Sequence, residues 1–366
     1  MKKIYILEAD PTRFGGIQQF VRNLAGYLPQ DRTFLLAYYR DLSGDKTLPV
    51  PLIRLNDGKS PARNGAYLSK SSLRRNFALL CDVFRIRRNL ARLLKGGDTL
   101  VVNSASAILL FCSRNVLKSN RIVLVQHTAA KMMRQRAFDF GGIFRNLKIA
   151  MFRKYVDTFV MLSPQEEKEF RGWLPLDGKN IAIIRHSSCF PDRVPDTFPL
   201  SVAMLCRLIP LKRVDRAVAC AAILPDIRFN IYGDGPLLRK LKKMAANTEN
   251  VHFCGYTDDI DMVFETNSLL LITSDYEGYG ICGIEACVRG RPVVVLNTYP
   301  AANDLVVNGV SGLVVDDLSP TALAQAVNKV FADYESYRTG ALSHRVVYDA
   351  DIARAKWRRL LLPEQE

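Results

Sequence analysis

Short apolar runs alternate along this chain with longer segments whose apolar positions have helical spacing. The runs are rich in β-branched residues and lack polar alternation, which predicts strands of parallel sheets covered by helices on both faces. In the first half the predicted strands are 3–8, 33–39, 99–103, 121–126, 158–163 and 181–185. In the second half they are 201–207, 228–233, 250–255, 268–274, 291–297 and 312–316. We therefore expect an α/β protein with two Rossmann-like domains, whose ligands bind at the carboxyl ends of the strands.

A segment without periodicity separates the two sets of strands. Residues 187–199 contain three prolines, which is typical of a linker. We expect a first domain over 1–188, a hinge over 189–199, a second domain over 200–345 and a C-terminal helix over 346–366. The tail is amphipathic, and packing back on the first domain is one use for its apolar face. Residues 41–70 form a second irregular region, either a mobile loop or a tolerated surface excursion.

The charge of the chain is divided unevenly. Residues 1–190 hold 32 Lys and Arg against 14 Asp and Glu, a net charge of +18, whereas residues 191–366 hold 19 and 22, a net charge of −3. Two basic amphipathic segments, 71–95 and 131–154, lie in the basic half. Such segments suit an anionic membrane surface, although two solvated surface helices would have the same pattern. Nucleic acid is not expected as a partner, because no nucleic-acid-binding motif accompanies the charge.

The composition disfavours several classes of protein. No stretch of 18 apolar residues is free of charge, so no membrane-spanning helix is expected. The apolar run at the N-terminus meets Glu8 and is too short for the core of a signal peptide. The eight cysteines form no Cys-x-x-Cys pair, and the four histidines have no ligand spacing. The sequence thus favours a cytoplasmic protein with reduced thiols and no metal site.

The strongest chemical signal begins at residue 274. Glu277 and Glu285 stand eight residues apart with Gly278 and Gly280 between them, and the surrounding pattern predicts strand, turn, helix and strand. Glu277 would lie in the turn, and Glu285 about two turns into the helix. The glycines let a ligand approach the backbone, and free amides at the start of the helix favour an anion. A phosphate site flanked by two carboxylates that accept hydrogen bonds from hydroxyls suits a sugar nucleotide.

This segment resembles the E-x7-E signature of retaining glycosyltransferases with the GT-B architecture, family 4 in particular. The matching residues are Glu277-Gly278-Tyr279-Gly280, Glu285-Ala286 and Gly290-x-Pro292-Val293. The resemblance implies two Rossmann-like domains that face each other across a cleft. It also implies transfer of a hexose from a nucleoside-diphosphate sugar, with UDP favoured over GDP, without a metal or an organic cofactor.

The implied acceptor is a hydroxyl of a glycolipid or a growing cell-surface glycan of the lipopolysaccharide, O-antigen or exopolysaccharide type. Together with the basic segments, this suggests a peripheral position at the inner face of the cell membrane.

The same resemblance assigns roles to further residues. Arg207 and Lys212 match the pair that holds the diphosphate. Glu277 would hold hydroxyls of the donor sugar, and Glu285 those of the ribose. The other donor-binding candidates are Gly16, Tyr256, Gly278, Tyr279, Gly280, Ile281 and Cys282, and His127 is a catalytic candidate beside Glu277, Arg207 and Lys212. Gly233 and Gly235 resemble the family's G-x-G-P turn, where a ligand role competes with a role in the turn itself. A structural role is also the alternative for His127 at its strand end and for Tyr256 as a packed tyrosine.

The chain departs from the family pattern at four places. Tyr279 replaces a common Phe, and Arg213 replaces the usual glycine. Ile184-Arg185-His186 stands where a Pro-Asn-Gly type of hinge is common, and Asn303-Asp304 stands where the family often has a Glu before Ile-Val. Two other functions stay open, a nucleotide-sugar epimerase of the same fold and a basic binding protein that retains the fold without turnover.

Overall fold

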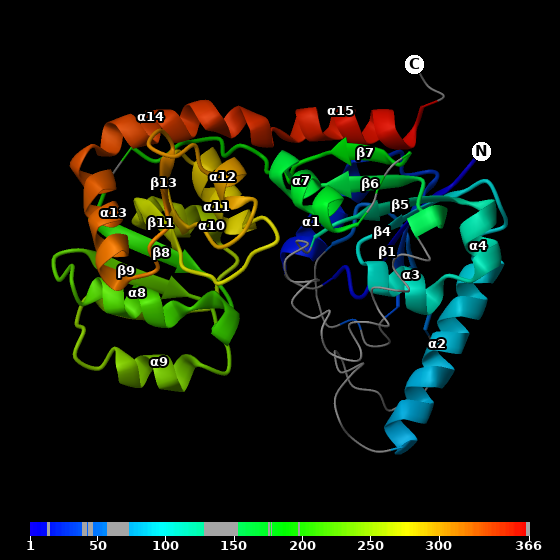
Figure 1. Ribbon diagram of the computed structural model, residues 1–366, viewed down its shortest axis with the longest axis horizontal. Coiled ribbons are helices and arrows are strands. Elements are labelled where there is room, and N and C mark those ends of the chain that lie inside the picture. Colours follow the sequence, from blue (N-terminus) through cyan, green and yellow to red (C-terminus); the bar gives the residue numbers. More distant parts are fainter. Residues whose placement is uncertain are drawn as a thin grey trace. The chain divides into compact units, whose positions relative to one another are not determined.

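The computed structural model describes the chain except for residues 13–14, 39–41, 43–46, 57–72, 128–152, 175, 177, 197 and 364–366. The chain divides into two compact units. The first comprises residues 1–162, 167–184 and 354–366, and the second comprises residues 163–166 and 185–353. Each unit is an α/β structure built on a parallel sheet (Figure 1), which confirms the predicted fold class.

The first unit contains a seven-stranded sheet in the order β3-β2-β1-β4-β5-β6-β7. Its strands are β1 (Ile4–Glu8), β2 (Thr33–Ala37), β3 (Leu52–Arg54), β4 (Thr99–Val102), β5 (Arg121–Val125), β6 (Thr158–Met161) and β7 (Asn180–Ile183). All described pairs in this sheet are parallel, as the continuous apolar runs predict. The sequence does not predict β3, which lies within the region taken as irregular. This strand is three residues long and lies at the sheet edge, so it is too short to show a periodicity.

Helices pack on both faces of the first sheet. They are α1 (Gly16–Tyr27), α2 (Leu73–Leu93), α3 (Ala105–Phe111), α4 (Arg114–Ser119), η1 (Arg153–Tyr155), α7 (Pro164–Trp173) and α15 (Ala350–Leu361), the last two in part. One core cluster joins Leu100 and Val102 of β4 to Ile86 and Leu90 of α2. The C-terminal helix contributes Trp357, which is buried with its ring centroid 5.8 Å from that of Phe20 in α1. This contact joins the C-terminal helix to α1 of the first unit.

The second unit contains a six-stranded parallel sheet in the order β10-β9-β8-β11-β12-β13. Its strands are β8 (Ser201–Leu205), β9 (Arg228–Tyr232), β10 (Val251–Gly255), β11 (Leu269–Ile272), β12 (Val293–Leu296) and β13 (Gly312–Val315). The chain first builds outward from β8 to β9 and β10, and then crosses to β11 on the other side of β8. The direction of building therefore reverses between β8 and β11. In open α/β sheets this switch point is where ligands bind, at the carboxyl ends of the strands.

Helices also cover both faces of the second sheet (Figure 1). They are η2 (Pro210–Lys212), α8 (Val214–Ala221), α9 (Leu238–Met244), α10 (Ile260–Thr266), α11 (Ile281–Val288), α12 (Ala302–Leu305), α13 (Pro320–Ala332), α14 (Tyr334–His344) and η3 (Arg345–Tyr348). One core cluster joins Met204 and Leu271 of the sheet to Val218 of α8 and Val327 of α13. Because α11 begins directly after the turn that follows β11, its N-terminus lies at the switch point.

The point at which the chain passes between units differs from the expected hinge. Residues 185–353 belong to the second unit, so residues 189–199 lie entirely within it. Two residues just before this segment contact the second unit. Arg185 donates two hydrogen bonds to Asp304, at 2.6 and 2.7 Å, and Ser188 Oγ donates to Glu285 Oε2 at 3.1 Å. Similarly, the expected C-terminal helix over 346–366 is divided, because residues up to 353 belong to the second unit.

Candidate functional site

The loop after β8 carries Arg207 and is shaped by two glycines after β9. A Cβ atom on Gly233 would lie 1.9 Å from the carbonyl oxygen of Cys206, and one on Gly235 would lie 2.5 Å from that of Leu208. The two glycines therefore let the turn after β9 pack directly against the backbone of the loop that bears Arg207. This is a structural role in the turn. The Arg207 side chain is exposed and makes no hydrogen bond or ion pair with the described residues. It is thus available to an anionic ligand.

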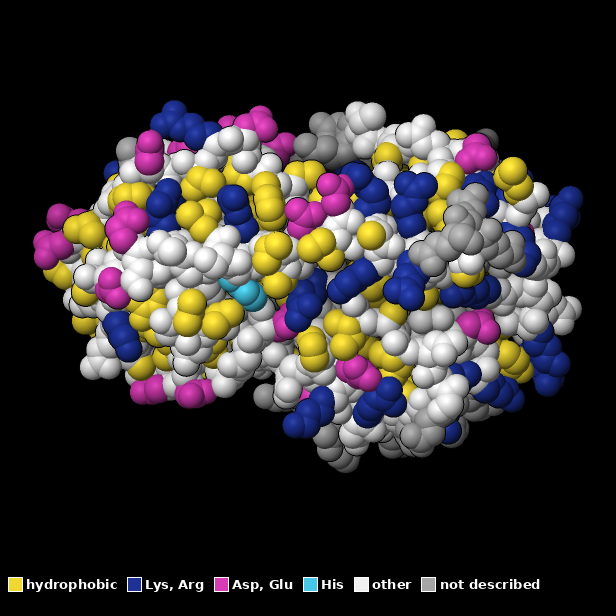
Figure 2. Space-filling model, turned by 90° about the horizontal axis from the view of Figure 1, so that it is seen from above, with side chains coloured by type: hydrophobic (Ala, Val, Ile, Leu, Met, Phe, Trp, Pro, Cys, Tyr) yellow, Lys and Arg dark blue, Asp and Glu magenta, His cyan; other side chains and the backbone are white. Residues whose placement is uncertain are grey.

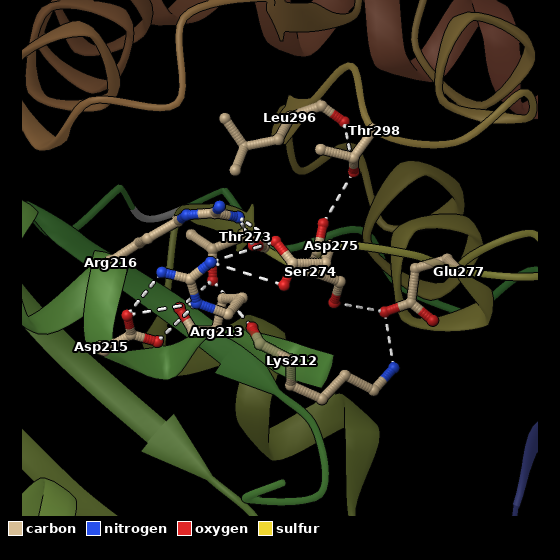
Figure 3. Close-up of polar contacts among 10 residues, drawn as sticks. All are labelled: Lys212, Arg213, Asp215, Arg216, Thr273, Ser274, Asp275, Glu277, Leu296 and Thr298. Carbon is tan, nitrogen blue, oxygen red and sulfur yellow. Dashed lines mark hydrogen bonds and ion pairs between the residues drawn. The ribbon is translucent and has the colours of Figure 1, made fainter. Parts of the chain in front are cut away.

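Lys212 and Glu277 meet at the carboxyl ends of β8 and β11 (Figure 3). Lys212 Nζ lies 2.5 Å from Glu277 Oε1, which also accepts a hydrogen bond from Ser274 Oγ at 2.6 Å. The side chains of Lys212 and Glu277 are only 17% and 13% exposed. The structure therefore brings together the two sequence motifs, which lie 65 residues apart. Sequence reasoning missed Ser274, although its position three residues before Glu277 made it a candidate.

A second set of charges lies beside this pair. Arg213 binds Asp215 at 2.8 Å and Asp275 at 3.2 Å, and Arg216 binds Asp275 at 2.8 Å. Figure 3 shows these groups on the other side of Ser274 from Glu277. Arg213 has a φ of 47°, the left-handed conformation that explains why a glycine is usual at this position. Its ion pairs with Asp215 and Asp275 direct its charge away from Glu277.

The N-terminus of α11 contributes unpaired backbone donors to the same place. Gly280 precedes the helix with a φ of 93° and gives it no side-chain cap. The amides of Ile281 and Cys282 in the first turn therefore face no capping side chain, and the positive end of the helix favours an anion. Burial raises the pKa of the Cys282 thiol to about 12, so this side chain is neutral at physiological pH. Whether the helix end, Lys212 and Arg207 hold a diphosphate together stays a prediction.

Glu285 is held within the helix by partners that the sequence analysis did not consider. Its Oε2 accepts hydrogen bonds from Arg289 at 2.7 Å and from Ser188 at 3.1 Å. Arg289 lies four residues further along the helix, a spacing at which ion pairs form and which could have been seen in the sequence. Arg289 also binds Asp261 at 2.8 Å. The other oxygen of Glu285 has no partner among the described residues and can accept from a ligand.

Two of the donor-binding candidates occupy other environments. The ring of Tyr279 is buried, and its hydroxyl donates to Asp304 Oδ2 at 2.5 Å. Its side chain therefore points into the interior, and only its backbone borders the turn between Gly278 and Gly280. Tyr256 follows the edge strand β10 and is 57% exposed, which leaves its ring accessible for stacking.

The remaining candidates, Gly16 and His127, belong to the first unit. His127 follows β5, its Nε2 lies 3.2 Å from Asn103 Oδ1, and its ring lies edge-on to Phe20. Gly16 is the first residue of α1. Sequence reasoning missed Glu8, which ends β1, is buried and accepts a hydrogen bond from Gln18 at 3.0 Å. Its place at the carboxyl end of a predicted strand was the available signal. The predicted cleft between the two sheets stays a prediction.

The sequence of the second unit matches a known family over most of this site. Residues 194–341 match the family Glycosyl transferases group 1. The second unit carries a group 1 glycosyltransferase domain. This domain includes Arg207, Lys212, Glu277 and Glu285, so the contact between Lys212 and Glu277 lies within the matched segment.

Comparisons with individual proteins extend the likeness. The chain resembles the poly(glycerol-phosphate) alpha-glucosyltransferase of Bacillus subtilis (strain 168), which is 30% identical over 142 residues, 37% of this chain and 21% of that protein. The chain thus matches about a fifth of that relative's length. Sucrose-phosphate synthase from Thermosynechococcus elongatus aligns with 98% of both chains at a TM-score of 0.79 and 17% identity. Anabaena Alr3699/HepE in complex with UDP and glucose aligns with 99% of both at a TM-score of 0.74 and 16% identity. These structural likenesses show the GT-B fold over the whole chain.

Proposed function

We propose that this chain is a retaining glycosyltransferase that moves a hexose from a nucleoside-diphosphate sugar to a hydroxyl of a glycolipid or growing cell-surface glycan. The observation that carries the proposal is the contact between Lys212 and Glu277 at the switch point of the second sheet. It joins a cation suited to a diphosphate with a carboxylate suited to sugar hydroxyls, beside a helix N-terminus that favours anions. The match of residues 194–341 to a glycosyltransferase family supports it.

In the proposed reaction the bond between the anomeric carbon and the diphosphate oxygen breaks, and a bond from the acceptor oxygen to that carbon forms on the same face. The acceptor's proton leaves with the departing diphosphate. Arg207, Lys212 and the amides at the start of α11 would stabilise the charge that develops on the leaving group. Glu277 would hold sugar hydroxyls, and Glu285 those of the ribose. His127 and Gly16 of the first unit are proposed to border the donor.

The finer identity of donor and acceptor is also proposed. UDP is favoured over GDP, because a structure of the same fold holds UDP and glucose. A cell-surface acceptor is favoured by the relative that glucosylates poly(glycerol phosphate). We propose that Arg207 and Lys212 balance the charge of the diphosphate, so that no metal ion and no organic cofactor takes part.

A donor screen tests this proposal. We expect a UDP-hexose to raise the melting temperature of the full chain, since a ligand at a hundredfold excess over its dissociation constant stabilises by about 2.7 kcal/mol. The same sugar nucleotide should be hydrolysed slowly in EDTA without an acceptor. Conversion to an epimer without hydrolysis would indicate the epimerase instead. Binding without any turnover, with or without Mn²⁺, would indicate the non-catalytic binding protein, and activity that requires Mn²⁺ would contradict the metal-independent mechanism.

We further propose that the first unit binds an anionic membrane surface, which would hold the protein at the inner face of the cell membrane. In α2, Arg88, Arg92 and Lys95, which follows the helix, are exposed, and Phe84 is 68% exposed beside them. Cations near an exposed aromatic ring suit the headgroup region of a membrane. Figure 2 views the side on which α15 lies, where Lys and Arg side chains are also prominent.

The second basic segment, 131–154, lies outside the described residues except for its last two. Among the described helices, none has the length and apolar character needed to cross a bilayer.

Charge reversal on α2 tests the membrane proposal. Arg85 is unsuitable, because it binds Asp82 at 3.2 Å and Asn56 at 3.1 Å. Each Lys or Arg near an anionic membrane surface contributes about 1 kcal/mol to binding. Replacing Arg88, Arg92 and Lys95 with Glu should therefore abolish sedimentation with phosphatidylserine vesicles at low salt. Binding of the soluble donor should stay unchanged. The matched control reverses Arg239, Lys240 and Lys243, which are exposed on α9 of the second unit. Equal loss in both triple variants would indicate a general effect of net charge and contradict a membrane surface on α2.

A further inference from the structure

Three of the four departures from the family pattern meet at one point in the second unit. Tyr279 stands where Phe is common, Asp304 where a Glu is frequent, and Arg185 in place of a Pro-Asn-Gly type of hinge. The Tyr279 hydroxyl donates to Asp304 Oδ2 at 2.5 Å. Arg185 donates to the same oxygen at 2.7 Å and to Oδ1 at 2.6 Å. The hydroxyl that distinguishes Tyr279 from Phe thus donates to Asp304, and Arg185 neutralises the charge of Asp304.

The three side chains of this network are mostly buried, and further hydrogen bonds hold the backbone of Asp304. The side chains of Asp304 and Arg185 are 13% and 25% exposed, and the ring of Tyr279 is buried. The backbone carbonyl of Asp304 accepts hydrogen bonds from Tyr348 at 3.1 Å and from His344 at 3.2 Å. Burial raises the pKa of Tyr279 well above its ordinary value, so its hydroxyl keeps the proton that it donates.

This network lies at one end of the turn that bears Glu277. At the other end, Thr298 Oγ1 donates to the carbonyl of Ser274 at 2.7 Å, and Ser274 Oγ donates to Glu277. Tyr279 lies two residues after Glu277 and directly before Gly280, the residue that precedes α11. The turn is therefore held at both ends. At the end of Tyr279 the contacts are the bond from its hydroxyl to Asp304 and the approach of that hydroxyl to the Tyr348 hydroxyl at 3.2 Å.

We propose that Arg185, Asp304 and Tyr279 form a positioning network that fixes the turn bearing Glu277 for the transfer step. This inference rests on the proposed function, since it assigns to that turn the donor sugar. None of the three side chains needs to touch the donor, so all three are positioning residues. Because they fix the turn rather than the nucleotide, their loss should lower kcat and leave the affinity for the nucleoside diphosphate unchanged.

A double-mutant cycle with Tyr279→Phe and Asp304→Asn tests the network. Each single variant should lower kcat about tenfold, the loss expected for one hydrogen bond to a charged group. Affinity for UDP by isothermal titration should stay within about twofold of that of the unmodified protein. The double variant should be no slower than the slower single variant, because both changes break one network. The matched control is Tyr334→Phe, which removes another buried hydroxyl, bonded to Arg291 and to the carbonyl of Ser268, and should lower the melting temperature without lowering kcat.

The outcomes separate the network from the proposed function. An active unmodified protein with unchanged kcat in Tyr279→Phe overturns the network, as does a fully additive double variant. Equal losses of kcat in Tyr279→Phe and Tyr334→Phe would show a general effect of stability and overturn it as well. Where Asp304→Asn does not fold, Tyr279→Phe decides alone, because it only restores the residue common in the family. An unmodified protein that turns over no nucleotide sugar overturns the proposed function instead.

Discussion

Replacing Lys212 with alanine is expected to lower donor turnover by about 10²-fold or more, as the loss of a preorganised group that stabilises a leaving group does. The structure adds a reason to this expectation. Lys212 Nζ lies 2.5 Å from Glu277 Oε1, and both side chains are mostly sheltered from solvent. The variant therefore loses the cation for the diphosphate and also leaves the carboxylate of Glu277 without its ion-pair partner. Steady-state hydrolysis of the donor measures the effect.

Two further variants make this result specific. Arg207→Ala should lower turnover to a similar extent without a change in melting temperature, because the Arg207 side chain has no ion pair among the described residues to lose. Arg213→Gly is the control for a lost positive charge next to Lys212. Arg213 is bound to Asp215 and Asp275 and has a φ that suits glycine, so turnover should stay near that of the unmodified protein. Near-normal kinetics in both Lys212→Ala and Arg207→Ala would reject the diphosphate site.

The strands could be predicted because parallel sheets buried on both faces leave an unmistakable apolar pattern. The predicted runs over 201–207 and 268–274 correspond to β8 and β11. The carboxyl ends of parallel strands share one sheet edge, so these positions suffice to predict that Lys212 and Glu277 lie at the same edge. By contrast, β3 has only three residues and lies at an edge. So short an element carries no periodic signal.

The network around Asp304 shows where sequence reasoning ends. Arg185 and Asp304 are 119 residues apart, and no local pattern indicates that two unusual residues so distant in sequence bind each other. Arg185 belongs to the second unit, although the prolines place the expected hinge after it. Similarly, Tyr279 is a donor-binding candidate by its position in the signature, whereas its ring is buried in the structure. Local chemistry is visible in sequence, but partners across a fold are not.

Replacing each of the two glutamates of the signature is expected to change a different kinetic constant. Glu277→Gln should mainly lower kcat, because Glu277 lies in the turn against the sugar, where geometry changes as the anomeric carbon flattens. Glu285→Gln should mainly raise the KM for the donor, because the ribose hydroxyls are bound both before and during the reaction. Isothermal titration with the free nucleoside diphosphate separates the two roles, since this ligand has the ribose and lacks the sugar. Its affinity should fall in Glu285→Gln and change little in Glu277→Gln.

The ion pair of Glu285 with Arg289 requires a control of its own. Glu285→Gln weakens the hold on Arg289, which also binds Asp261 at 2.8 Å. Asp261→Asn removes that other carboxylate and leaves Glu285 in place, so it shows what a disturbed Arg289 does by itself. We expect Asp261→Asn to bind the nucleoside diphosphate normally, because the carboxylate proposed to accept from the ribose hydroxyls is that of Glu285. Weakened binding in Asp261→Asn equal to that in Glu285→Gln would assign the effect to Arg289. Unchanged affinity in Glu285→Gln, or a large loss in Glu277→Gln, would show that the two roles are wrongly assigned.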